Sequence, residues 1–149
     1  MTTGSAEVDE ELRAELRRAF DEFCPDMAQQ LRQYADLDPT SPLGRLADPE
    51  LQQFVNAFKA MVDEALEGPG RATRDLIFET ALPGVVASGR TPLEMARSTV
   101  ITAVMVAHRL LPLVAPEHRD GAARWLAAFY GGYLHELLER SQALLEGRR

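Results

Sequence analysis

The sequence TPLEMARSTVITAVMVAHRLLP, residues 91–112, decides the fold of this chain. Between residues 98 and 107 it carries no charged side chain, and a helix that is apolar on every side has to be covered on every side. Its start is marked by Thr91 as the capping residue, by Pro92 in the first turn and by Glu94 three residues after the cap. A proline closes it. We therefore predict a central helix that is enclosed by the rest of an all-α domain.

The composition is that of one ordinary globular domain. The chain has 149 residues, of which 46% are hydrophobic and 26% are charged. Charges near both ends of the central helix leave it about ten uncharged positions, whereas a membrane span needs roughly 20. The first residues lack a basic region followed by an apolar run, so nothing predicts export. We expect a cytoplasmic protein that does not bind a membrane.

Acidic residues are concentrated in the first half of the chain. Residues 1–70 hold 15 acidic and 6 basic side chains, a balance of −9, whereas residues 71–149 hold 8 and 10, a balance of +2. Phosphate binding requires a concentrated basic surface, and the arginines of the second half are scattered. The sequence therefore argues against a nucleic-acid-binding protein, although a few arginines are able to meet an acidic partner.

Helical periodicity begins at residue 12. Apolar residues spaced by three or four positions form one stripe on a helix, namely Leu12, Leu16, Phe20, Phe23, Met27, Leu31 and Tyr34. The stripe keeps its phase through Pro25, which leaves two alternatives: one helix kinked at the proline, or two helices that nearly share an axis. We expect the stripe to pack on its own domain, with pairing of two chains as the alternative. Residues 1–7 are expected to be disordered.

Two helices are expected between a surface loop at residues 36–48 and the central helix. Asp48 is predicted to cap the first, which begins at Pro49 and ends at residues 68–70. The second is predicted to run from about Thr73, with a bend or an interruption at residues 83–84. Their expected buried faces are Leu51, Phe54, Val55, Phe58, Met61, Val62, Ala65 and Leu66 in the first helix, and Leu76, Ile77, Leu82, Val85 and Val86 in the second.

The last helix is predicted to be the longest, from about Glu117 to Leu145. Gly131 and Gly132 lie in its middle, where each costs about 1 kcal/mol relative to alanine, and close approach of another helix usually offsets such a cost. One helical domain over residues 8–146 is expected, with a tail at residues 147–149. The last helix is predicted to bury Leu126, Phe129, Tyr130, Tyr133, Leu137 and Leu144.

Two groups of residues are candidates for binding. The first combines large rings with accessible backbone, which favours either a homodimer interface or a ligand cleft, with an ordinary core face as the alternative: Trp125, Phe129, Tyr130, Gly131, Gly132 and Tyr133. The second is predicted to line an apolar pocket, again with a simple core as the alternative: Phe54, Phe58, Met61, Met105 and His108.

Residues that carry catalysis or bind metal are scarce. The histidines at positions 108, 118 and 135 never occur at metal-ligand spacing, and Cys24 is the only cysteine. Acidic neighbours raise the pKa of a thiol, which argues against a nucleophilic role for Cys24. No nucleophile, phosphate loop or acid–base pair is recognisable. We therefore expect no enzyme activity and no cofactor, with His108 as a haem ligand or proton switch as the alternative to a histidine at the edge of the core.

The order of elements from residue 51 to residue 145 resembles the N-terminal sensor domain of RsbR-type stressosome proteins and RsbRD-like regulators. The likeness rests on the helix that ends at Leu66, the junction ASGRTPLEM at residues 87–95, the apolar helix to Leu111, and the FYGGYLHELLE segment at residues 129–139. The resemblance implies a globin-like fold without haem, a homodimer formed by the last two helices, and a role in relaying a signal to a regulatory partner. Family members usually continue into an output domain, which leaves a free-standing sensor or a fragment as the alternatives here.

The leading hypothesis is thus a non-enzymatic, dimeric, globin-like sensor or regulatory domain in the cytoplasm. A ligand or protein partner that prefers one packing of the last two helices would shift the population between dimer geometries. The alternative is a helical protein that binds haem, a fatty acid or another apolar molecule between the central helix and the helix that carries Phe54 and Phe58.

Overall fold

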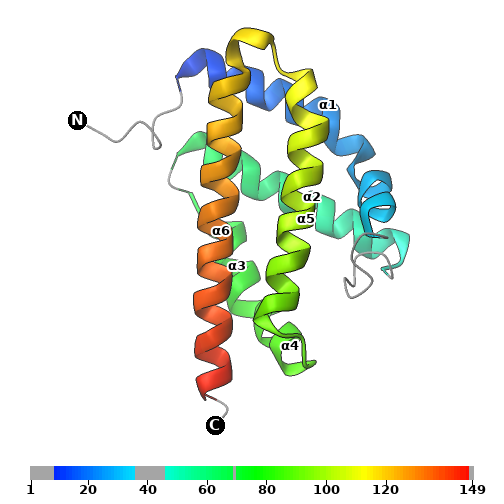
Figure 1. The fold of residues 1–149 in the computed structure, drawn as a ribbon, viewed down its shortest axis with the longest axis vertical. Coiled ribbons are helices and arrows are strands. Elements are labelled where there is room, and N and C mark those ends of the chain that lie inside the picture. Colours follow the sequence, from blue (N-terminus) through cyan, green and yellow to red (C-terminus); the bar gives the residue numbers. More distant parts are fainter. Residues whose placement is uncertain (1–8, 36–45, 69, 148–149) are drawn as a thin grey trace, which may run out of the picture.

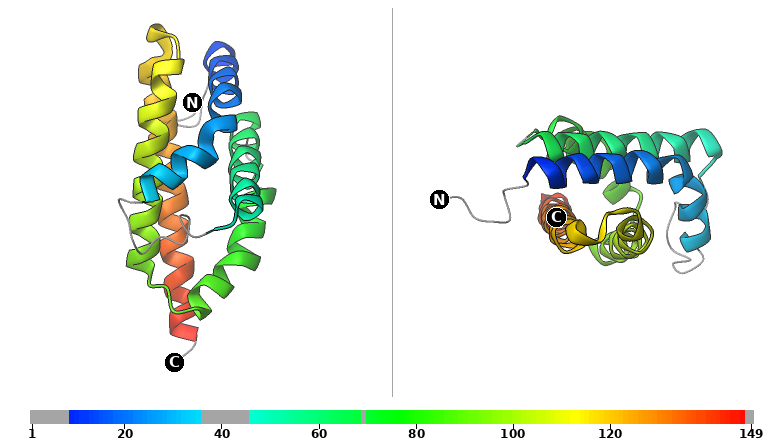
Figure 2. Two further views of the ribbon diagram at one scale, coloured as in Figure 1. Left: turned by 90° about the vertical axis from the view of Figure 1, so that its right-hand side faces the viewer. Right: turned by 90° about the horizontal axis from the view of Figure 1, so that it is seen from above.

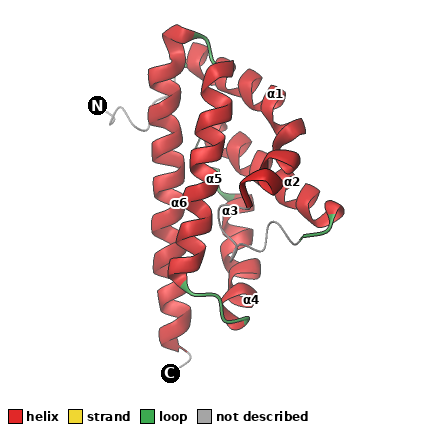
Figure 3. Cartoon of the chain, turned by 45° about the vertical axis from the view of Figure 1, so that its right-hand side comes forward, coloured by secondary structure: helices red, strands yellow, loops and turns green. Residues whose placement is uncertain are grey.

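A computed structural model describes residues 9–35, 46–68 and 70–147. All regular structure in these ranges is helical, so the prediction of an all-α domain is confirmed (Figure 3). The expectations for residues 1–7, for most of the loop at residues 36–48 and for the end of the tail lie outside the described residues.

The helices form two layers, which the end-on view of Figure 2 separates clearly. One layer holds α1 and α2, and the other holds α5 and α6 as an antiparallel pair (Figure 1). The short helices α3, η3 and α4 lead from the end of α2 to the start of α5. The bounds are α1 Glu10–Ala35, α2 Asp48–Glu67, α3 Ala72–Leu76, the π-helix η3 Ile77–Ala81, α4 Leu82–Ala87, α5 Pro92–Leu110, the 3-10 turns η4 Leu111–Leu113 and η5 Pro116–His118, and α6 Arg119–Gly147.

The first helix is continuous, with Pro25 inside its 26 residues. Figure 2 shows that α1 bends along its length, which agrees with the alternative of one helix kinked where proline lacks an N–H and crowds the preceding turn. The apolar stripe faces the protein interior as predicted. Its middle five members are buried and its two end members are half-buried.

Helix starts are set by local hydrogen bonds. At the start of α5, Thr91 Oγ1 accepts a bond from the Glu94 amide (3.1 Å), and Glu94 Oε1 accepts one from the Thr91 amide (3.0 Å), which confirms the predicted capping box. At α2 the capping residue is Ala47 instead of Asp48, because the Ala47 carbonyl accepts the first helical hydrogen bond, from the Leu51 amide at 2.9 Å. Glu50 Oε1 also accepts the Ala47 amide hydrogen at 3.0 Å. α6 begins two residues later than predicted, since residues 116–118 form a 3-10 turn.

The enclosure of α5 is the main prediction that proved wrong. Met105 and Val106 are buried, but Leu93, Val100 and Val104 are 79%, 48% and 58% exposed. The reason is architectural: α5 belongs to one of only two layers, and no described helix covers its outer side (Figure 2). Lack of charge permits burial but does not require it, because much of any protein surface is apolar.

The segment after α2 differs from the expected regular helix. In the π-helix η3 the Leu82 amide donates to the Ile77 carbonyl, five residues back, directly before Pro83, which has no N–H to offer. The wider turn changes which side chains face inward. Phe78 is buried while Leu76 is 63% exposed, so the predicted burial of Leu76 was wrong.

Buried apolar side chains form two clusters, which we call the larger core and the smaller core. Among the described residues, the larger core holds nineteen buried ones from α1, α2, α5, α6 and the connection between α5 and α6. At its centre the Phe20 ring lies 5.9 Å from the rings of both Phe58 and Trp125. The smaller core holds five, namely Phe78, Leu82, Val86, Met95 and Leu137.

Candidate functional site

An apolar cavity of about 340 Å³ lies between α2, the η3–α4 segment, α5 and α6. This volume is at the lower end of the roughly 300–1,000 Å³ typical of small-molecule sites. Residues from several different elements converge on it: Phe54, Ala57, Phe58, Met61, Ile77, Phe78, Ala81, Leu82, Val85, Arg90, Met95, Ser98, Thr99, Thr102, Phe129, Tyr130, Tyr133 and Leu137.

Aromatic rings that contact one another form much of the cavity wall. The Tyr130 ring stacks on Phe58 at 6.4 Å between centroids, and Phe129 meets Phe58 edge-on at 6.3 Å. On the side of η3, the rings of Phe78 and Tyr133 lie 5.1 Å apart. Such mutual contacts hold the rings in place, so that they present a preformed apolar surface.

The threonines of α5 do not make this wall polar. Thr99 Oγ1 donates to the Met95 carbonyl and Thr102 Oγ1 donates to the Ser98 carbonyl, both at 2.9 Å. Both hydroxyl hydrogens are thus engaged by the backbone of the same helix. The charged side chain in the lining is Arg90, whose Nη2 donates to Ser98 Oγ at 3.3 Å. No acidic side chain is among the described lining residues.

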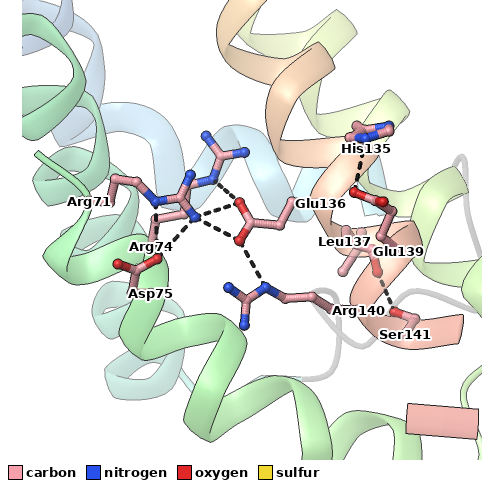
Figure 4. Close-up of polar contacts among 9 residues, drawn as sticks. All are labelled: Arg71, Arg74, Asp75, His135, Glu136, Leu137, Glu139, Arg140 and Ser141. Atoms are coloured by element: carbon pink, nitrogen blue, oxygen red, sulfur yellow. Dashed lines mark hydrogen bonds and ion pairs between the residues drawn. The ribbon is translucent and has the colours of Figure 1, made fainter. Parts of the chain in front are cut away.

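A cluster of arginines around Glu136 lies beside the cavity (Figure 4). Arg71 Nη2 donates to both carboxylate oxygens of Glu136 at 2.6 Å, and Arg140 Nε donates to Oε2 at 2.8 Å. Arg74 Nε approaches Oε1 at 3.2 Å as an ion pair without hydrogen-bond geometry. Arg71 also binds Asp75. Because Arg71 and Arg74 flank the start of α3 and Glu136 lies on α6, the cluster ties these two helices together.

The same arginines cover the outer side of the cavity wall. The Arg74 guanidinium lies 5.9 Å from the Phe78 ring and 5.7 Å from the Tyr133 ring, and that of Arg140 lies 5.5 Å from Phe78. Burial raises the pKa of Glu136, but the hydrogen bonds and charge of Arg71, the charge of Arg74 and the hydrogen bond of Arg140 outweigh it and hold this pKa below its usual range. Glu136 is therefore ionised at neutral pH and balances the neighbouring arginines.

The exposed side of the α5–α6 pair carries an apolar stripe that we call the outer face. On α5 it consists of Leu93, Val100 and Val104, and on α6 of Ala127, Gly131 and Leu138, all of them exposed. Spacings of seven and four residues keep each set on one side of its helix. Arg97 and His108 of α5 continue the stripe with polar groups.

The structure divides the predicted interface residues between the two sides of α6. Gly131 is exposed, and a Cβ atom there would meet nothing within 4 Å. Gly132 faces Arg74, and a Cβ atom there would lie 3.6 Å from the nearest guanidinium nitrogen. The rings of Trp125, Phe129, Tyr130 and Tyr133 instead face the protein interior, where Trp125 stacks on Phe129 at 5.1 Å. The expectation that rings and glycines share one surface was therefore wrong, because residues one or two positions apart on a helix point in different directions.

Some of the predicted pocket residues line the cavity and others do not. Phe54, Phe58 and Met61 line the cavity, whereas Met105 is fully buried in the larger core and His108 is exposed. Arg90 and the contribution of η3 to the lining were not predicted from the sequence. Tyr130 and Tyr133 were expected both among the buried residues of the last helix and at an interface, and the structure agrees with the first expectation, since they lie four residues from the buried Leu126 and Leu137.

The remaining reactive side chains form no site among the described residues. Burial, more than the nearby Asp21 and Asp63, raises the pKa of the Cys24 thiol to about 11, while Lys59 opposes the shift. His135 is exposed and pairs with Glu139 at 2.9 Å (Figure 4). Within the described ranges, no three histidine, cysteine or acidic side chains come close enough together to hold a metal ion.

Comparisons of the chain with protein-family models, with curated proteins and with solved structures find no match. None of the described helices combines the length and the apolar character that crossing a membrane requires.

Proposed function

We propose that this chain is a non-enzymatic regulatory domain of the cytoplasm, which acts as a homodimer and relays a stimulus through the packing of α5 and α6. The proposal includes a globin-like sensor fold of the RsbR and RsbRD type and a protein partner in a signalling pathway. The observation that carries it is the apolar outer face on the two helices to which the family resemblance assigns dimer formation.

The composition of the outer face favours a second copy of the chain as its partner. Leu93, Val100 and Val104 expose large apolar surface on α5, which is unusual for a helix that stays in water. Ala127 and Gly131 supply a shallow strip on α6 against which another helix can approach closely. Under two-fold symmetry, the large side chains of α5 in one chain can pack on the small residues of α6 in the second chain. The reverse contact then forms at the same time, so the outer face is self-complementary.

Sedimentation velocity of the wild-type chain and of Val100→Glu tests this proposal. We expect a dimer at tens of micromolar for the wild type, and a Kd at least about tenfold higher for Val100→Glu, because the variant buries an unpaired charge in the interface. The matched control is Leu76→Glu, since Leu76 is an exposed apolar residue outside the outer face and its substitution should leave the dimer intact. A wild-type chain that stays monomeric at high micromolar concentration would contradict the proposal.

The cavity favours a second candidate function, the binding of an apolar small molecule. Its position supports a link with the first, since α5 and α6 contribute to the cavity on one side and carry the outer face on the other. The described lining contains no histidine or cysteine, and His108 is exposed away from it, so a ligand other than haem is favoured. Mass spectrometry of protein purified under native conditions tests this candidate by detecting a bound apolar molecule.

A further inference from the structure

The cavity and the outer face use different sides of the same two helical stretches, residues 93–104 of α5 and residues 127–138 of α6. We infer that an apolar molecule in the cavity strengthens the pairing of two chains through the outer face. The inference rests on both candidate functions and joins them, because it makes the bound molecule the stimulus and the dimer the response.

On α5 the two sets of side chains alternate along the helix. Val100 of the outer face lies two positions from both Ser98 and Thr102 of the cavity lining. Residues two positions apart on a helix point about 200° apart, which places them on nearly opposite sides. A shift of this stretch therefore moves a wall of the cavity and a part of the outer face together.

The same alternation occurs on α6. Tyr130 and Tyr133 line the cavity, while Gly131 between them is exposed on the outer face. Leu137 lines the cavity and is buried, and the next residue, Leu138, is 37% exposed on the outer face. Both helices that carry the outer face therefore also form walls of the cavity.

An empty cavity leaves the inner sides of these two stretches with fewer packed neighbours than the rest of the bundle has. A space of about 340 Å³ faces them, and five of the described residues form the smaller core at this end, compared with nineteen in the larger core. Side chains that border an empty space lose dispersion contacts on that side, and sparsely packed regions open at a low cost in free energy. A bound apolar molecule supplies the missing contacts and restricts the motion of both stretches.

The sign of the coupling follows from the order that pairing requires. Two chains pack through the outer face when α5 and α6 hold one relative position, so pairing restricts the same stretches that the bound molecule restricts. Once the molecule has ordered them, pairing loses less conformational entropy, and the coupling is positive. Coupling between two sites typically changes affinity by a factor of about 5–150, and the factor is the same in both directions.

Sedimentation velocity with and without methylnaphthalene tests the inference. This neutral, apolar probe has about eleven carbon atoms, which suits a cavity somewhat more than twice the roughly 150 Å³ that holds benzene. We expect saturating probe to lower the Kd of the wild-type dimer at least about fivefold. Calorimetric titration should show the reverse effect, with Val100→Glu binding the probe at least about fivefold more weakly than the wild-type dimer.

A variant that fills the cavity provides a second test. Ala57 lines the cavity on α2, and Ala57→Phe should lower the dimer Kd without any probe and remove the response to the probe. The matched control is Ala60→Phe, since Ala60 is half-buried on the same helix but outside the lining and its substitution should leave both measurements unchanged. Circular dichroism checks that each variant folds.

Hydrogen exchange separates coupling through the helices from a probe that simply lies between two chains. In the weakly pairing variant Val100→Glu, the probe should slow amide exchange in residues 93–104 and 127–138 and leave α1 unchanged. If the wild-type chain dimerises and binds the probe, but the probe leaves the dimer Kd unchanged or raises it, the inference is wrong and both candidate functions stand. If the chain does not dimerise, or if the probe does not bind, the corresponding candidate function fails together with the inference.

Discussion

The two ends of this helical bundle differ in how completely side chains fill the space between the helices. At the end where α1 crosses the α5–α6 pair, nineteen buried residues form the larger core and aromatic rings meet at 5.9 Å around Phe20. At the other end five of the described residues form the smaller core, and the space between α2, η3 and α6 remains open as a cavity. The cavity thus lies where the long first helix does not reach.

Polar contacts between elements occur at both ends of the bundle. Beside the larger core, Glu15 of α1 accepts the Ala115 amide hydrogen at 2.6 Å and so fixes the connection between α5 and α6. Beside the cavity, three arginines hold Glu136, and two of them, Arg71 and Arg74, attach the start of α3 to α6. Glu64 of α2 accepts a bond from the Thr73 amide at 2.9 Å. Polar contacts therefore connect elements at both ends of the bundle, while the apolar packing differs between the ends.

The largest expected effect compares a ring at each end. Phe20→Ala should lower the free energy of unfolding by about 3–5 kcal/mol, because the Phe20 side chain is fully buried and tightly packed. Phe78→Ala should cost less, about 2 kcal/mol, since the ring borders an existing cavity and loses fewer contacts. Urea denaturation of both variants measures the difference. Equal losses would mean that the two ends do not differ in packing.

The next effect concerns the arginine cluster. Glu136→Gln should lower the free energy of unfolding by about 1–2 kcal/mol at neutral pH, because it leaves the arginines without their shared anion, although their partial exposure limits the cost. Urea denaturation at pH 7 measures this loss. Glu139→Gln is the matched control, since Glu139 on the same helix is exposed and pairs with the exposed His135 outside the cluster.

The pH dependence of this loss can be derived from the pKa of Glu136. The cluster lowers that pKa in the folded state, so the stabilisation is complete above the unfolded value of about 4.3 and disappears as the pH falls through the lower folded value. The difference between wild type and Glu136→Gln should therefore be constant near neutral pH and narrow only in acid. A difference that instead changed around pH 7 would contradict this assignment.

The smallest effect is expected where the two ends meet. The hydroxyl of Tyr130 is buried and has no hydrogen-bond partner among the described residues, while its ring packs against Phe58. Tyr130→Phe removes an unsatisfied polar group and should raise the free energy of unfolding by up to about 1 kcal/mol. Thermal denaturation detects this gain. A clear loss of stability would show that the hydroxyl has a bonding partner in solution.

Local signals in the sequence predicted the helices well, whereas relations between helices could not be predicted. The capping box at Thr91 and Glu94 depends on residues three positions apart, and the stripe of α1 depends on spacings of three and four. The open outer side of α5 depends on how many layers the bundle has, which no single segment encodes. An apolar run from residue 98 to residue 107 is compatible with full or partial burial.

The candidate site was only partly predictable for the same reason. The apolar side of α2 was enough to predict Phe54, Phe58 and Met61 as pocket residues, but the pocket also needs η3, whose π turn at residues 77–81 has no simple sequence signal apart from Pro83. Arg71 and Glu136 are 65 positions apart, so the arginine cluster appears only once α3 and α6 are packed together.

The buried position of Cys24 gives the chain an internal reporter of its own motions. Alkylating reagents attack a thiolate, and here the thiol is both hidden in the larger core and held protonated by burial, which raises its pKa to about 11. Labelling then requires that α1 separate from its neighbours, so the reaction rate follows the opening of that end of the bundle. Since the sequence contains one cysteine, each labelled molecule records one such opening event without any engineered probe.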